Sequence, residues 1–137
     1  MILVDTSAWV EFLRSSGHPV HLTLARHLHA GSPIVTTEVV VMELLAGTSG
    51  KRDHDRLRQR LLALPQVRLR GMPDFEAAAE LYRRCRHRGG TVRKLVDCLI
   101  AAVAIREDAS VLHNDRDFDV LHRLTRLRVE PVVASPA

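Results

Sequence analysis

Short apolar segments rich in β-branched residues alternate with segments of helical periodicity along this chain of 137 residues. The apolar segments predict strands at 1–4, 34–36, 67–69, 110–113 and 129–133. The segments between them predict helices, several of which end at Gly or Pro, at 8–14, 21–29, 39–46, 51–64, 73–87, 93–107 and 118–124. Such alternation is typical of α/β proteins, so we expect a three-layer α/β/α sandwich with a short central parallel sheet.

The length and composition predict one domain over residues 1–137, with 46% hydrophobic and 26% charged residues. No apolar run approaches the roughly 20 residues of a membrane helix. The segment 1–4 lacks the basic flank and cleavage site of a signal peptide. We therefore expect a cytoplasmic protein without membrane contact, in which Cys85 and Cys98 are buried thiols.

The net charge of +4 comes almost entirely from arginine, because Lys51 and Lys94 are the only lysines. Arginine suits phosphate recognition, since its planar guanidinium binds two phosphate oxygens at once. Basic clusters on or near predicted helices are therefore candidates for RNA contact, with solvated helix faces as the alternative. The candidates for RNA contact are Arg86, Arg88, Arg93 and Lys94.

Asp97 is the acidic residue that is hardest to explain by structure alone. It lies in Leu95–Ile105, a predicted helix that is apolar nearly all round and is therefore expected to be buried. A buried carboxylate is costly unless it is paired or binds a metal. The structural alternative is an ion pair with Arg93, one turn earlier. Glu43 shows the same conflict more mildly, because it stands among apolar residues in 39–46.

Two further acids follow predicted strands. Asp5 ends the first strand, and Asp115 follows the strand at 110–113. Ligands of open α/β sheets gather at the carboxyl ends of strands, so both positions favour a functional site. Helix N-capping is the alternative for Asp5, Asp115 and the neighbouring Asp117.

Several carboxylates that meet at one point repel one another unless a cation binds them, and oxygen ligands suit Mg²⁺ or Mn²⁺. One or two such ions activate a water and stabilise charge on a phosphate during in-line displacement. That reaction does not use the RNA 2′-hydroxyl and leaves 5′-phosphate and 3′-hydroxyl ends.

The order of these acidic motifs resembles that of PIN-domain proteins, and within them the VapC toxins of toxin–antitoxin pairs. Met1–Val10, with Asp5, resembles the opening strand and first acid of the family. Glu43 in Met42–Gly47 matches the second acid and Asp97 in 97–102 the third. The last acidic turn matches His113–Phe118, where both Asp115 and Asp117 fit.

The resemblance implies a Mg²⁺- or Mn²⁺-dependent endoribonuclease, often acting on tRNA or ribosomal RNA. It implies the catalytic residues Asp5, Glu43, Asp97 and Asp115. Asp5, Asp97 and Asp115 are the expected metal ligands, with Glu43 and Asp117 as ligands directly or through water. Thr6 matches a supporting hydroxyl. The expected partners are an antitoxin and a second copy of the chain, in a homodimer or a toxin–antitoxin hetero-oligomer.

Three alternatives stay open at this point. A receiver-like signalling domain also binds Mg²⁺ on an α/β fold. It has an adjacent acidic pair after the first strand and a lysine late in the chain, whereas here Asp5 stands alone and the last lysine is Lys94. A phosphohydrolase has an Asp-x-Asp-x-Thr motif, whose second acid is missing after Asp5. A PIN nuclease of RNA processing, without toxicity, differs from a toxin only in its biological role.

Overall fold

The centre of the fold is a parallel sheet of four short strands in the order β2-β1-β3-β4, in a computed structural model that describes residues 1–133. Ile2 pairs with both Ile34 and Ser110, and Val4 pairs with Leu112. All residues of β1 and β3 are buried, as expected for strands that are covered on both faces. The strands are β1 (Ile2–Val4), β2 (Ile34–Val35), β3 (Ser110–Leu112) and β4 (Arg128–Val129).

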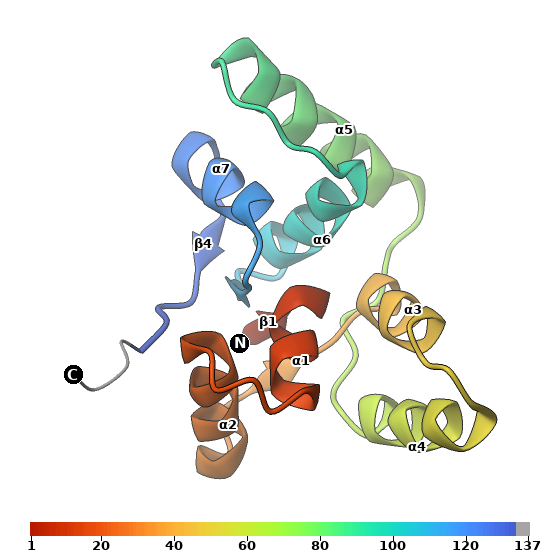
Figure 1. The fold of residues 1–137 in the computed structure, drawn as a ribbon. Helices are drawn as coiled ribbons and strands as arrows, with labels where there is room; N and C mark the ends of the chain where they lie inside the picture. Colours follow the sequence, from red (N-terminus) through yellow and green to blue (C-terminus); the bar gives the residue numbers. More distant parts are fainter. Residues whose placement is uncertain (134–137) are drawn as a thin grey trace.

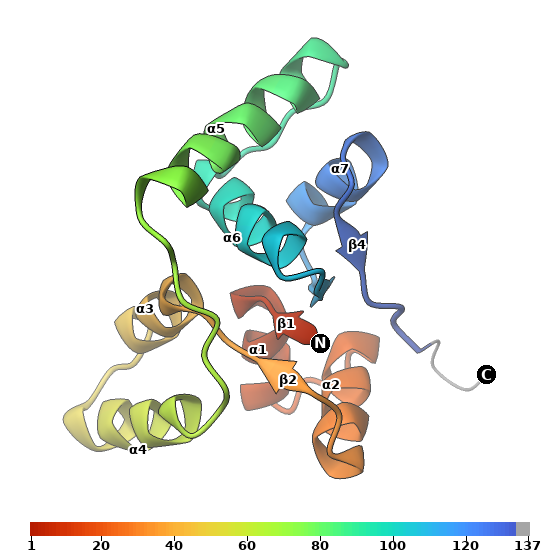
Figure 2. The same cartoon turned by 180° about the vertical axis from the view of Figure 1, so that it is seen from behind.

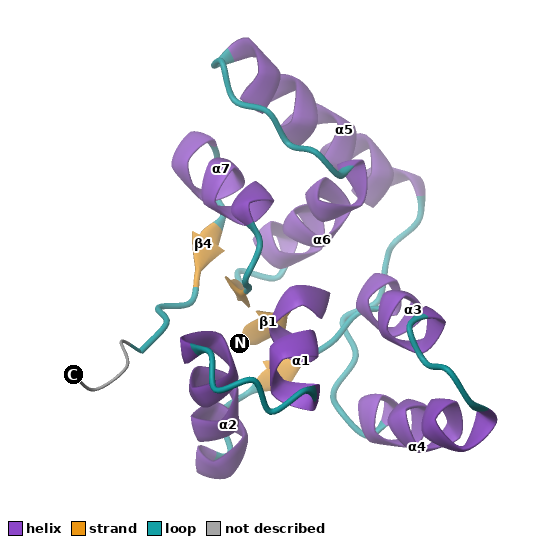
Figure 3. Ribbon diagram, viewed as in Figure 1, coloured by secondary structure: helices purple, strands orange, loops and turns teal. Residues whose placement is uncertain are grey.

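Within the described residues, seven helices flank this sheet, and the strands lie between two groups of helices (Figures 1 and 2). One group contains α1 to α4, and the other contains α5 to α7, with α6 against β3. Figure 3 shows how little of the chain is strand compared with helix. The predicted α/β/α sandwich is confirmed. The helices are α1 (Thr6–Leu13), α2 (Pro19–Ala30), α3 (Glu38–Ala46), α4 (Lys51–Leu62), α5 (Met72–His87), α6 (Leu95–Arg106) and α7 (Arg116–Leu124).

Helix α6 is the most deeply buried helix of the sandwich. Every residue from Asp97 to Ala104 is buried, because α6 packs between α5, α7 and β3. Helix α6 has no polar face in its sequence because other elements cover nearly all of its sides. Both cysteines are buried free thiols, as predicted. No helix among residues 1–133 is long and apolar enough to cross a membrane.

Two predicted strands differ from the structure. The segment 67–69 is not a strand, because only one bridge, between Gln66 and Thr36, joins it to the sheet edge. The strand predicted at 129–133 is instead β4 at Arg128–Val129, and Pro131, which has no backbone N–H, follows two residues later. The predicted domain 1–137 also includes 134–137, which lie outside the described residues.

Candidate active site

The strand order reverses between β1 and β3, since the chain runs from β1 outward to β2 and then returns to the other side of β1. At such a reversal, the loops that follow the two strands diverge and leave a crevice at their carboxyl ends. Asp5 directly follows β1, and Asp115 lies three residues beyond β3. The parallel register of Val4 with Leu112 therefore brings the two acidic loops to the same edge of the sheet.

Asp5 is both buried and a helix cap. Its side chain is the N-cap of α1, and its Oδ2 accepts hydrogen bonds from the Ser7 backbone N–H at 3.0 Å and the Ser7 hydroxyl at 2.6 Å. Burial raises the pKa of Asp5, and the Ser7 hydrogen bonds oppose that rise. Capping and a functional role are thus not exclusive at this position, since capping fixes the direction of a buried carboxylate.

Three carboxylates form the tightest acidic group, which we call the acidic triad: Asp97, Asp115 and Asp117. One carboxylate oxygen of each lies within 4.8 Å of the others. Asp97 comes from the first turn of α6, Asp115 is the N-cap of α7, and Asp117 lies in the first turn of α7. Two helix N-termini therefore face this group, and their dipoles favour negative charge.

Asp97 is 1% exposed, and its Oδ2 accepts no hydrogen bond from any group in the described residues. Burial, then the neighbouring Asp117 and Asp5, raise the pKa of Asp97 to about 8, while the nearby Lys94 ammonium opposes the rise. A buried carboxylate oxygen without a hydrogen-bond donor is a position where a cation is strongly favoured.

Asp115 and Asp117 have different surroundings. Asp117 is 2% exposed, and its two oxygens accept hydrogen bonds from the backbone N–H groups of Arg93 and Lys94, both at 2.9 Å. Burial works against ionisation, but these bonds and the contact with Asp97 outweigh it and lower the pKa of Asp117. Asp115 accepts the Asp117 N–H through Oδ1, and its side chain is 19% exposed. Asp115 is thus the more accessible of the two carboxylates, and Asp117 positions the loop before α6.

Lys94, not Arg93, is the cation at the triad. Its ammonium lies 2.9 Å from Asp115 Oδ2 and 3.7 Å from Asp97 Oδ2. The ion pair suggested for Arg93 is therefore wrong, since the side chain of Arg93 is exposed and only its backbone N–H contacts the acidic triad. The hydrogen bond to Asp115 raises the pKa of Lys94 despite partial burial. The i,i+3 spacing of Lys94 and Asp97 was the available sequence signal.

Glu43 lies outside the acidic triad and is partly buried on α3. Its Oε1 accepts a hydrogen bond of 2.8 Å from the Thr6 hydroxyl, so Thr6 supports Glu43. Ser7 is a further residue of the site, which was not among the predicted site residues. Besides donating to Asp5, the Ser7 hydroxyl accepts the Asn114 N–H at 2.8 Å, so it ties the loop after β1 to the loop after β3.

Arg86 and Arg88, two of the residues predicted to contact RNA, form contacts with other parts of the protein. The Arg86 guanidinium lies over the Tyr82 ring, 5.8 Å from its centroid, and Arg88 donates to the Leu124 carbonyl at 3.0 Å. No hydrogen bond or ion pair within residues 1–133 joins either arginine to the acidic triad. Arg86 and Arg88 are exposed near the end of α5, whereas Arg93 and Lys94 lie beside the triad.

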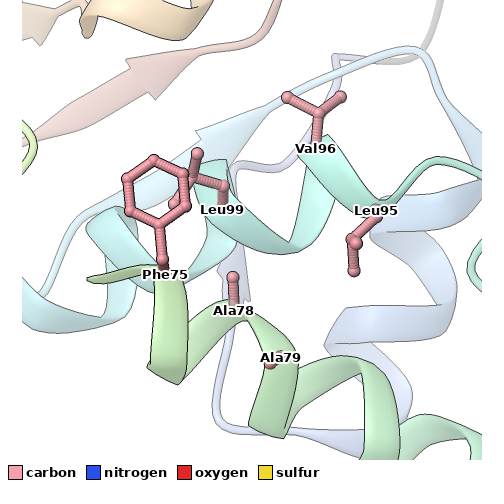
Figure 4. A pocket seen from close by; sticks show the side chains of 6 residues that line it. All are labelled: Phe75, Ala78, Ala79, Leu95, Val96 and Leu99. Atoms are coloured by element: carbon pink, nitrogen blue, oxygen red, sulfur yellow. The ribbon is translucent and has the colours of Figure 1, made fainter. Parts of the chain in front are cut away.

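An apolar pocket opens between α5 and the N-terminal end of α6, the end that carries Asp97 (Figure 4). Phe75 is 51% exposed and Leu95 is 58% exposed, which is unusual for large apolar side chains. Exposed apolar surface of this kind is typical of contacts with other molecules. The pocket is lined by Phe75, Ala78, Ala79, Leu95, Val96 and Leu99.

Comparison with known proteins gives a consistent result. The PIN-domain family matches residues 2–124. The Mycobacterium tuberculosis protein "Ribonuclease VapC11" is 43% identical over 129 residues, which are 93% of this chain and 96% of that protein. Among solved structures, VapBC2 from Rickettsia felis, bound to a DNA fragment from its promoter, matches with a TM-score of 0.72 and 22% identity over 95% of this chain and 98% of that chain. A toxin–antitoxin complex from Klebsiella pneumoniae matches with a TM-score of 0.64 and 21% identity over 86% and 90% of the two chains.

Proposed function

Because the chain belongs to the PIN-domain family and, within it, to the VapC ribonucleases, we propose that it is an endoribonuclease that depends on Mg²⁺ or Mn²⁺. The observation that carries this proposal is the buried Asp97 carboxylate, which lies in the acidic triad and whose Oδ2 has no hydrogen-bond donor among the described residues. The ligand set consists of oxygens alone, which suits these two hard cations.

The acidic residues fall into two groups in this proposal, direct ligands of the ion and residues that act directly or through water. Asp97, Asp115 and the neighbouring Asp5 would hold the ion, and Glu43 and Asp117 would contribute directly or through water. A divalent ion held there supplies an acidified water and neutralises charge on the phosphate. Ser7 fixes the direction of Asp5, as Thr6 does for Glu43, and Asp117 anchors the loop that carries Lys94.

Metal removal tests the metal dependence. Protein treated with EDTA should lose RNA cleavage, and adding Mg²⁺ or Mn²⁺ in excess should restore it. EDTA already saturated with Mg²⁺ is the control, because it separates metal removal from binding of EDTA itself. Cleavage that persists in excess EDTA would contradict the proposal.

The chemistry of the product ends tests the mechanism. In-line attack by water leaves a 5′-phosphate and a 3′-hydroxyl, whereas attack by the RNA 2′-hydroxyl leaves a cyclic phosphate. Ligation-based sequencing that requires 5′-phosphate ends should therefore recover the cut sites, and it should also identify the RNA. We expect structured tRNA or ribosomal RNA, which places the activity in the cytoplasm.

We also propose that the chain is the toxin of a toxin–antitoxin pair, with a VapB-like protein as its partner. The support is the 43% identity to a VapC ribonuclease and the shared fold with toxin–antitoxin complexes. Induction of the chain alone should stop growth, and co-expression of a small neighbouring reading frame should restore it. Growth that is unaffected by an active nuclease would favour a role in RNA processing. The homodimer stays a prediction, to be tested by light scattering.

A further inference from the structure

Lys94 places an ammonium group on the carboxylate oxygens that the proposed function assigns to a metal ion. Its Nζ lies 2.9 Å from Asp115 Oδ2 and 3.7 Å from Asp97 Oδ2. Among residues 1–133 no other cationic side chain forms an ion pair with these two acids. Lys94 is therefore their counter-ion.

The backbone of Lys94 is held by a hydrogen bond to Asp117, whereas its side chain is half-exposed. Lys94 is the N-cap residue of α6, and its N–H donates to Asp117 Oδ2 at 2.9 Å, next to the bond from Arg93 to Oδ1. The side chain is 53% exposed, so it has solvent on one side and carboxylates on the other. A lysine has a flexible four-carbon stem and forms no fixed bidentate contact, so it moves without disturbing the loop.

The ammonium and a divalent ion compete for the same oxygens. Asp97 Oδ2 has the ammonium as its nearest cation, at a distance too long for a hydrogen bond. An ion bound by Asp97 and Asp115 would share these oxygens with the ammonium. Two positive charges at such a distance repel each other strongly in a partly buried site.

We propose that Lys94 is an exchangeable counter-ion, which neutralises Asp97 and Asp115 until a divalent ion binds and then moves into solvent. This inference rests on the proposed metal dependence. It assigns Lys94 the role of a positioning residue, which sets the metal affinity and keeps the repelling carboxylates together. Its ammonium becomes free for an RNA phosphate only in the metal-loaded protein, so metal binding precedes that contact.

Metal binding in lysine variants tests the exchange without using activity. Mn²⁺ affinity, measured from the free-ion signal in electron paramagnetic resonance, should be about threefold to tenfold tighter for Lys94→Met than for the wild type. Lys94→Arg keeps the charge and should stay closer to the wild type. Lys51→Met is the matched control, because it removes the only other lysine, which is exposed on α4. It should change the affinity less than about twofold.

The wild-type protein provides a second readout that needs no variant to fold. With only two lysines in the chain, ¹³C labelling at lysine Cε gives two signals, which Lys51→Met assigns. Adding Mg²⁺ should shift the Lys94 signal and leave that of Lys51 unchanged. Mg²⁺ binding that leaves the Lys94 signal in place, or equal Mn²⁺ affinity in Lys94→Met, overturns the exchange but not the proposed function. A wild type that binds neither ion overturns both.

Discussion

Two buried aspartates lie near opposite ends of α6, and their surroundings differ. Asp97 belongs to the first turn of α6, whereas Asp74 belongs to α5 and contacts Arg106, the last residue of α6. Asp74, near the end of α6, is 3% exposed and receives a two-pronged contact from the Arg106 guanidinium at 3.0 and 3.1 Å, as well as the Arg70 N–H at 2.7 Å. Asp97, at its start, is 1% exposed, and its Oδ2 has only the Lys94 ammonium at 3.7 Å. Burial alone therefore does not mark a functional acid.

The pKa values of the two groups express this difference. Burial disfavours the charge of Asp74, but the hydrogen bond and charge of Arg106 outweigh it and lower the pKa of Asp74. Burial and neighbouring carboxylates raise the pKa of Asp97 to about 8. Asp74 thus has a directly hydrogen-bonded cationic partner, whereas Asp97 has only the more distant Lys94 ammonium. The following predictions test that contrast.

The largest expected effect is on catalysis. Asp97→Asn removes a charge from the proposed metal site with little change in shape, so cleavage should fall at least about 1,000-fold. The measurement is the single-turnover cleavage rate in Mg²⁺ with the RNA identified by sequencing. Asp53→Asn, an exposed position on α4, is the control and should retain the wild-type rate. Wild-type activity in Asp97→Asn would remove Asp97 from the site.

The next effect is on stability at the other end of α6. Arg106→Leu leaves Asp74 buried without its partner and should lower the free energy of unfolding by roughly 2–4 kcal/mol. Urea titration at neutral pH measures this loss. Adding Asp74→Asn to Arg106→Leu removes the buried charge and should recover part of it. A double variant that is less stable than Arg106→Leu would show that Asp74 has another essential partner.

Asp97→Asn should have the opposite effect on stability. The folded protein holds the Asp97 proton more tightly than the unfolded chain, since the pKa is raised from 3.8 to about 8. Charging Asp97 therefore destabilises the fold increasingly as the pH rises between these values. In EDTA, Asp97→Asn should be more stable than the wild type by about 1–2 kcal/mol at pH 8 and almost equal to it near pH 4. A variant that is less stable at pH 8 would mean that Asp97 is a satisfied structural residue.

The smallest effect is the acid dependence of the Asp74–Arg106 pair. Because the pKa of Asp74 is lowered in the folded protein, its contribution is present above the ordinary carboxyl pKa and is lost as the pH falls through the folded value. The stability difference between the wild type and Arg106→Leu should therefore shrink by about 1 kcal/mol between about pH 6 and about pH 2.5. Chemical denaturation at several pH values measures it, and a constant difference would exclude a charge effect.

The sequence predicts most of what depends on local pattern. Strand ends locate Asp5 and Asp115, and the apolar surroundings of Asp97 indicate its burial. The partners of these acids depend on side chains that meet across the fold. Asp74 lies in the first turn of α5, but it pairs with Arg106, 32 residues away, which no local pattern indicates. The choice of Lys94 over Arg93 depends likewise on the direction of the loop, which Asp117 sets from α7.

The central place of β1 in the sheet has a consequence for synthesis of the chain. The first strand pairs with β3, so Asp5 meets Asp115 only after more than a hundred further residues have been made. Contacts so distant in sequence form late in folding. A nascent chain on the ribosome therefore lacks a complete acidic site until the segment that carries Asp115 and Asp117 has emerged. If the chain is the ribonuclease toxin that we propose, this topology prevents RNA cleavage before the loop that carries Asp115 has been made.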